Sequence, residues 1–179
     1  MHRVAVALLL LAAAGVASPA ARAADAIDPF IGTFKGKAEV ETESGLKKRD
    51  VAVTISKSSR GFSVDWTTTI PKANGKRKIK QFKIQFSPAK RKKLYAAGMR
   101  RNLFGKLVPL NPLKGDPYMW AAIRGDVLFV YGMHVTDDGG YEFQVYERKI
   151  VPGGMNVTFK RFRDGKQLKD INAELKRTK

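Results

Sequence analysis

The sequence predicts an all-β protein that forms a single antiparallel up-and-down β-barrel of about 8 to 10 strands. Apolar and polar residues alternate in short segments along most of the chain, which is the pattern of half-buried strands. Clusters of Gly, Pro, Asn, Asp and Ser separate these segments, and no long stretch has convincing helical spacing. A β-sandwich is the alternative architecture. Closure into a barrel would remove the exposed edge strands.

The N-terminus has the three regions of a cleavable signal peptide. Arg3 supplies a basic start, Val4–Val16 is an apolar run, and small residues precede a cleavage site after Ala23. The apolar run is shorter than the roughly 20 residues that span a bilayer. We therefore expect residues 1–23 to be a signal peptide, residues 24–179 to form a single β-barrel domain, and the mature protein to be periplasmic or secreted.

The first expected strand shows the clearest alternation. From Phe30 to Glu41 apolar residues and glycines occupy one face and polar residues most of the other. Gly32 and Gly36 lie on the apolar face, where they suit a strongly bent strand at a barrel corner. The further strands expected are 51–55, 62–68, 82–86, a short optional strand at 94–99, then 118–124, 127–135, 141–150, 156–162 and 167–177.

Two segments have less regular patterns. Residues 100–117 are rich in Pro and Gly, and we interpret them as a long loop. The last segment, 167–177, could form a helix, because Leu168, Ile171 and Leu175 are three and four residues apart. We favour a strand, since its apolar residues also alternate and a hairpin turn, Asp164-Gly165, precedes it.

The segment Phe30-Ile31-Gly32-Thr33-Phe34-Lys35-Gly36 resembles the opening strand of lipocalin-like (calycin) barrels, which carry a Gly-x-Trp motif there. Phe34 stands where the Trp would be, and we match no basic residue on a late strand to the one that supports this Trp in the family. The resemblance extends loosely over the mature chain as a meander of hairpins. It implies a barrel and specifies no ligand.

Catalytic and metal-binding patterns are sparse. The mature chain has one histidine, His134, and no nucleophile-elbow motif. It has no cysteine, which excludes thiol catalysis, thiolate metal sites and disulfides. The run from Asp137 to Gly140 is more simply a turn than a calcium site. We expect no enzymatic activity, no metal and no cofactor.

Large aromatic side chains on alternating positions are candidates for the wall of a ligand pocket. Each could equally be ordinary core, because a sequence does not report a void. Trp66 and Trp120 are favoured because an indole carries a donor that needs a partner. The candidate ligand-binding residues are Phe34, Phe62, Trp66, Trp120 and Tyr131.

Positive charge is the second strong feature of the chain. The net charge is +18, of which +16 remains after removal of the signal peptide, and residues 66–115 contain no Asp or Glu. This asymmetry predicts one basic face that attracts polyanions. The candidate residues for an anionic surface are Lys90, Arg91, Lys92, Lys93, Arg100, Arg101 and Lys106. The apolar residues among them could insert into a membrane, fold inward as a lid, or pack on neighbouring strands of a solvated loop.

These features give two functional hypotheses. The first is an exported, non-enzymatic binding protein whose barrel holds a small apolar or amphipathic ligand, with the basic region favouring an anionic group. The second is a cell-envelope protein whose basic face binds anionic lipid or polysaccharide. Salt separates them, because binding to an exposed face weakens as ionic strength rises and enclosed apolar binding does not. A physiological nucleic-acid partner is not expected for an exported protein.

Overall fold

The computed structural model describes residues 25–178, apart from 43–44, 73, 99, 102–106 and 109. The predicted signal peptide over residues 1–23 lies outside this part of the chain. No helix among the described residues is both long and apolar enough to cross a membrane.

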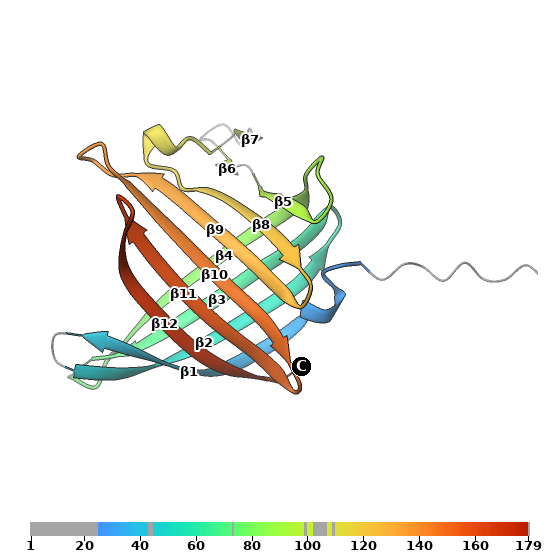
Figure 1. Cartoon of the computed structure of the whole chain (residues 1–179). Coiled ribbons are helices and arrows are strands. Elements are labelled where there is room, and N and C mark those ends of the chain that lie inside the picture. Colours follow the sequence, from blue (N-terminus) through green and yellow to red (C-terminus); the bar gives the residue numbers. More distant parts are fainter. Residues whose placement is uncertain are drawn as a thin grey trace, which may run out of the picture.

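Ten strands form one closed antiparallel barrel, in the order β1-β12-β11-β10-β9-β8-β5-β4-β3-β2 (Figure 1). Successive barrel strands are neighbours, so the up-and-down barrel is confirmed and the sandwich alternative is excluded. Strands β6 and β7 form a separate two-stranded sheet. The elements are η1 (Asp28–Phe30), β1 (Gly32–Thr42), β2 (Gly45–Ser58), β3 (Gly61–Pro71), β4 (Arg77–Pro88), β5 (Leu94–Ala97), β6 (Arg100–Arg101), β7 (Leu107–Val108), η2 (Pro112–Lys114), β8 (Tyr118–Arg124), β9 (Val127–Val135), β10 (Tyr141–Val151), β11 (Gly154–Arg163) and β12 (Lys166–Arg177).

The final segment is strand β12, as favoured over a helix. It closes the barrel by pairing with β1, where Gly36 lies opposite Leu175. A Cβ atom on Gly36 would lie 2.1 Å from the carbonyl oxygen of Glu174. Gly36 is therefore required by the close approach of the two strands at this seam.

The segment 100–117 is less uniform than the long loop predicted from its composition. It contains the short strands β6 and β7 and the 3-10 turn η2. The side chain of Asn111 caps η2 by accepting a hydrogen bond from the backbone N–H of Leu113, 3.0 Å away.

The two ends of the barrel differ. At one end, on the right of Figure 1, η1 covers the barrel and Phe30 is fully buried beside Phe34, Phe62 and Phe86. We call this the closed end. At the other end lie the β1–β2, β3–β4, β9–β10 and β11–β12 hairpins, and we call this the open end.

A basic residue secures the closed end. The guanidinium carbon of Arg177 lies 4.5 Å from the ring centroid of Phe34, and this side chain donates hydrogen bonds to the carbonyl oxygens of Ile31 and Pro29. Arg177 is thus a late-strand basic residue that packs on the residue at the Gly-x-Trp position. Sequence reasoning did not identify it, because Arg177 is one of several cations in an exposed C-terminal run.

Candidate functional site

A cavity of about 300 Å³ occupies the open half of the barrel lumen. Its wall is formed by β1 to β4 and β10 to β12. Most of the wall is aliphatic or aromatic, including Val53, Trp66, Phe82, Phe159 and Ile171. Five cations share this surface, and none of the described lining residues is acidic. These cations are Arg49, Lys80, Arg148, Arg161 and Lys169.

Arg148 is the most unusual of these residues. Its side chain is only 1% exposed, and its Nε and Nη1 atoms are buried without a hydrogen-bond partner. No ion pair joins it to a carboxylate in the described part of the chain. Burial lowers its pKa to about 10, so the guanidinium still carries its charge at neutral pH. A buried charge with unused donors is unfavourable unless something else satisfies it.

Aromatic rings hold the guanidinium in place. Its central carbon lies 5.2 Å from the ring centroid of Tyr146 and 5.5 Å from that of Trp66. Trp66 stacks on Phe82 at 5.5 Å, and Tyr146 packs on Phe159 at 4.6 Å. These contacts stabilise the cation and fix its position without using its N–H donors.

The five cations lie at different depths. Arg148 pairs with Leu128 on β9 and Val157 on β11, both buried, and therefore stands at the inner limit of the cavity. Lys80, Arg161 and Lys169 lie within a few residues of the hairpins at the open end. A molecule entering from that end meets the exposed Lys80 and Lys169 and the half-buried Arg161 first, and the buried Arg148 last. Arg49 also carries a buried Nε without a partner.

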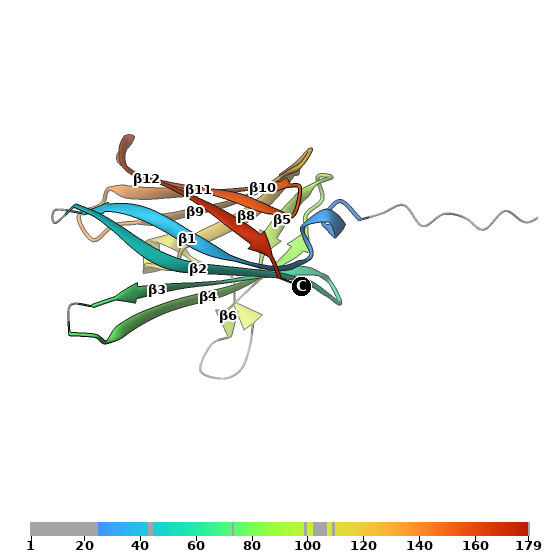
Figure 2. The same cartoon turned by 90° about the horizontal axis from the view of Figure 1, so that it is seen from below.

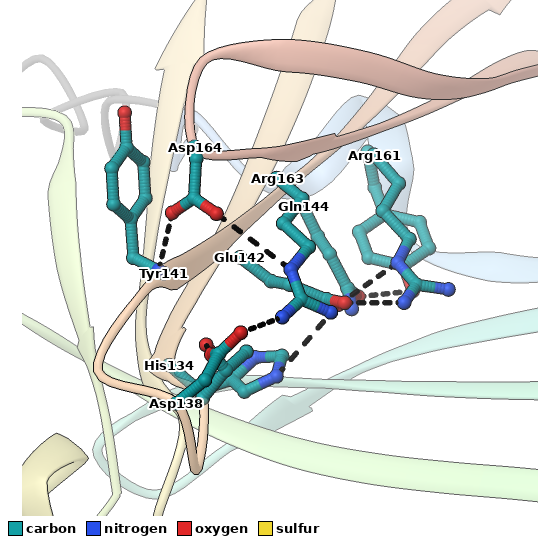
Figure 3. A network of polar contacts seen from close by, with 10 residues as sticks. His134, Asp138, Tyr141, Glu142, Gln144, Arg161, Arg163 and Asp164 are labelled. Atoms are coloured by element: carbon teal, nitrogen blue, oxygen red, sulfur yellow. Dashed lines mark hydrogen bonds and ion pairs between the residues drawn. The ribbon is translucent and has the colours of Figure 1, made fainter.

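A polar network joins two hairpins at the open end (Figure 3). Glu142 on β10, 5% exposed, accepts hydrogen bonds from Arg161, one of them from Nε at 2.9 Å. His134 Nε2 lies 3.7 Å from Oε2 of the same carboxylate, the oxygen that also accepts the hydrogen bond from Arg161 Nε. The hydrogen bonds from Arg161 keep the pKa of Glu142 below its usual value, and the pKa of Arg161 is raised in turn.

The network continues into the turns. Arg163 forms ion pairs with Asp138 in the β9–β10 turn and with Asp164 in the β11–β12 turn. Asp164 also accepts a hydrogen bond from the backbone N–H of Tyr141 at 2.9 Å. Asp138 accepts hydrogen bonds from Thr136 and Arg163, which lower its pKa. These bonds hold the two hairpins together. The described residues contain no group of metal-ligating side chains.

The five predicted ligand-binding residues lie in three places. Trp66 lines the cavity. Phe34 and Phe62 are fully buried in the closed half, where they form core rather than cavity wall. Trp120 and Tyr131 pair across β8 and β9 and stack at 5.0 Å. Strand alternation puts them on the outer face of the barrel, because their neighbours Ala121 and Val130 are in the core.

The predicted basic surface is separated from the cavity. Lys90, Arg91, Lys92 and Lys93 are exposed in the turn between β4 and β5, at the closed end. Arg100 and Arg101 form β6, of which only the backbone is described, and Lys106 lies outside the described residues. Of the loop 100–117, for which the sequence leaves a lid or a membrane anchor open, residues 102–106 and 109 are likewise outside the described part.

Sequence reasoning did not identify the cavity cations. A signal for Arg148 was nevertheless present. In the alternation of β10 it occupies the face that carries Tyr146 and Ile150, so a charged residue stands at an inward position. The same signal applies to Arg161, which shares the inward face of β11 with Val157 and Phe159.

Comparisons with known proteins address the fold alone. No family model matches the sequence, and no curated protein matches it. Among solved structures, the chain is similar to Rv2717c from M. tuberculosis, with a TM-score of 0.52 and 12% sequence identity, over 87% of this chain and 99% of that chain. The ten-stranded closed antiparallel barrel fits a calycin-like barrel fold.

Proposed function

We propose that this chain is an exported, lipocalin-like binding protein without enzymatic activity, and that its barrel encloses a small amphipathic anion. The acidic group of the ligand would contact Arg148 at the inner limit of the cavity. Its apolar body would contact the wall formed by Val53, Phe159 and Ile171.

The size of the cavity limits the ligand. About 300 Å³ is at the lower end of the range of ligand pockets, roughly 300 to 1,000 Å³. It corresponds to the volume of roughly ten water molecules in the liquid. A ligand with on the order of a dozen non-hydrogen atoms would fill it, which excludes large lipids as fully enclosed ligands.

The single observation that carries the proposal is the unpaired, buried guanidinium of Arg148. A barrel core without a ligand would be more stable with an apolar residue at this position. A bound carboxylate, sulfonate or phosphate would accept the unused N–H groups in a site of low dielectric constant, where charge-assisted hydrogen bonds are strong. The aromatic contacts hold the guanidinium in position before the ligand arrives.

A matched pair of ligands tests the proposal. Decanoate and decanol have the same chain length and differ in charge, and calorimetric titration measures their affinities. We expect the wild-type protein to prefer decanoate by about tenfold or more, since a hydrogen bond to a charged group contributes about 1.5–3 kcal/mol. The Arg148→Met variant should lose this preference and keep its affinity for decanol.

Arg124→Met is the control variant. Arg124 also stacks on an aromatic ring, 5.3 Å from the centroid of Phe129, but on the exposed outer face. It should behave like the wild type. Equal affinities of wild-type protein and Arg148→Met for decanoate would overturn the proposal. Native mass spectrometry of protein purified from its own periplasm gives an independent readout, since it reports both a co-purifying small acid and cleavage after Ala23.

A further inference from the structure

Three hairpins at the open end share an unusual composition. They comprise the described residues of the ranges 41–48, 70–80 and 166–170, without 43–44 and 73, and we refer to them together as the hairpin rim. The rim so defined contains nine Lys and Arg residues against two Asp and Glu. Its described basic side chains are all exposed. A surface of this charge attracts anionic partners.

Large apolar side chains are exposed on the same rim. Leu46 is 64% exposed, Ile79 is 65% exposed and Leu168 is 45% exposed. Alternation within β2 and β4 places Leu46 and Ile79 on the outer face, because the inward positions of these strands, such as Arg49 and Lys80, line the cavity. Leu168 lies where the register of the β11–β12 pairing shifts. Single exposed apolar residues are common on soluble proteins. Here one stands on each of three adjacent hairpins, among lysines.

The β3–β4 hairpin extends this surface to the cavity. Every residue of β4 from Arg77 to Lys83 is exposed, on both faces of the strand. Figure 2 shows this hairpin diverging from the rest of the barrel at the open end. Phe82, which is 53% exposed, lines the cavity, whereas Ile79, three residues earlier, lies on the opposite face of β4. The β3–β4 hairpin therefore carries exposed apolar side chains on both of its faces, and one of them borders the cavity.

The turn at the closed end provides a comparison. Lys90, Arg91, Lys92 and Lys93 concentrate a similar charge, and all four are exposed. None of the exposed large apolar side chains of the described residues lies in this turn. The rim and the turn thus carry a similar positive charge, and they differ in that the described rim residues also include exposed large apolar side chains.

We propose that the hairpin rim docks on an anionic lipid bilayer. Its Lys and Arg side chains contact the head groups, while Leu46, Ile79 and Leu168 enter the boundary between head groups and acyl chains. Docking in this way presents the cavity mouth to the membrane surface. The inference stands on rim residues and not on the ligand of the cavity, so it is independent of the function proposed above.

Two matched charge variants test the proposal. The rim variant combines Lys72→Gln, Lys76→Gln, Arg77→Gln and Lys78→Gln. The turn variant combines Lys90→Gln, Arg91→Gln, Lys92→Gln and Lys93→Gln, and so removes the same three Lys and one Arg from the opposite end. Co-sedimentation with vesicles of phosphatidylglycerol and phosphatidylcholine measures binding. We expect the rim variant to bind roughly 600-fold more weakly, since each of its four basic residues near an anionic surface contributes about fivefold.

The turn variant should bind within about fivefold of the wild type. Equal losses in both variants would show nonspecific attraction by net charge and would overturn the proposal. All substituted side chains are exposed, and circular dichroism confirms that each variant keeps its strands. Neither variant should bind pure phosphatidylcholine vesicles better than the wild type does.

Apolar substitutions distinguish a bilayer from an anionic polysaccharide. The triple variant Leu46→Ser, Ile79→Ser, Leu168→Ser should bind anionic vesicles about tenfold or more weakly and should bind dextran sulfate as the wild type does. Quenching of Ile79→Trp by brominated lipids, measured against the intrinsic signal of Trp66 and Trp120, reports insertion. Unchanged vesicle binding by the triple variant would contradict docking through these residues.

The proposed ligand site and the proposed membrane-docking surface can be tested independently of each other. The rim variant should keep its affinity for decanoate in solution, because its substituted residues do not line the cavity. Arg148→Met should bind vesicles as the wild type does, because Arg148 is buried.

Discussion

The closed and open halves of the barrel are built from the same strands but differ in what faces inward. In the closed half the inward side chains are apolar and fully buried, as for Phe34, Phe62 and Phe86. In the open half the same strands present Lys80 and Arg148 among apolar neighbours. The change occurs within single strands: β10 carries Arg148 two residues before the apolar Ile150. Closed-half side chains fill the barrel, and open-half side chains leave a charged cavity.

This difference indicates how the fold can tolerate the cavity. Burial of aromatic and aliphatic side chains in the closed half stabilises the barrel. The unpaired guanidinium of Arg148 has the opposite effect, because burial removes water from a charge that gains no carboxylate partner. Removal of a buried closed-half side chain should therefore lower the free energy of unfolding most, and removal of the unpaired charge of Arg148 should raise it.

The largest effect is expected from a matched pair of phenylalanines. Phe62 is fully buried at the closed end and packs on Phe86 at 5.3 Å and on Tyr95 at 4.9 Å. Phe62→Ala should lower the free energy of unfolding by about 3–5 kcal/mol, through lost burial and the cavity created. Phe82→Ala, at the open end, should lower it by only about 1 kcal/mol, because the ring is half exposed and loses mainly its stacking on Trp66.

Urea unfolding followed by circular dichroism measures both values. Decanoate binding serves as the second readout, since Phe82 lines the cavity and Phe62 does not. Similar losses of stability for the two variants would show that the halves are not energetically distinct.

An intermediate effect of opposite sign is expected at Arg148. Arg148→Met should raise the free energy of unfolding of the ligand-free protein by about 1–4 kcal/mol, because it replaces an unpaired buried charge by an apolar side chain of similar length. Its pKa of about 10 means that the guanidinium is charged and the penalty is present throughout the neutral range. The substitution should at the same time abolish the preference for decanoate.

Thermal unfolding with and without decanoate measures this trade-off. The wild-type protein should gain stability on addition of the ligand, and Arg148→Met should not. A destabilised Arg148→Met variant without ligand would show that the guanidinium is part of the structural core. Arg124→Met again serves as the control, because its charge is exposed to solvent.

Most of the fold was predictable because strand alternation and hairpin turns are local signals. These two signals together predicted the barrel and predicted that the segment forming β12 is a strand. The same alternation did not separate the inner from the outer face: Trp66 and Tyr131 each alternate with their neighbours, yet one lines the cavity and the other lies outside. The assignment of a face depends on which side of the sheet closes inward, and this is a property of the whole barrel.

The candidate site was predicted less well for a physical reason. The basic residues that stand out in the sequence are consecutive, as in 90–93, and consecutive residues on a turn are exposed to solvent. Cavity cations occur singly on β2, β4, β10, β11 and β12, and pairing brings them together. Arg148 could have been found as a charge on the apolar face of its strand. The absence of an ion-pair partner for Arg148 could not have been predicted, because it depends on side chains that are distant in the sequence.

The smallest effect is expected at the polar network of the open end. Glu142→Gln should lower the free energy of unfolding by about 1–2 kcal/mol at neutral pH, because Arg161 loses a charged acceptor that is almost fully buried.

The effect of Glu142 on stability should depend on pH. Since the folded-state pKa of Glu142 lies below its usual value of 4.5, its contribution to stability is present above that pH and is lost as the pH falls through the folded-state pKa. The difference between wild-type and Glu142→Gln proteins should thus shrink as the pH falls below about 4.5. Urea unfolding at a series of pH values measures this difference, and a gap that stays constant down to about pH 3 would show that the carboxylate is not stabilised by Arg161. An effect this small, compared with that of Phe62→Ala, would place the stability of the barrel in its closed half and leave the open half free to vary.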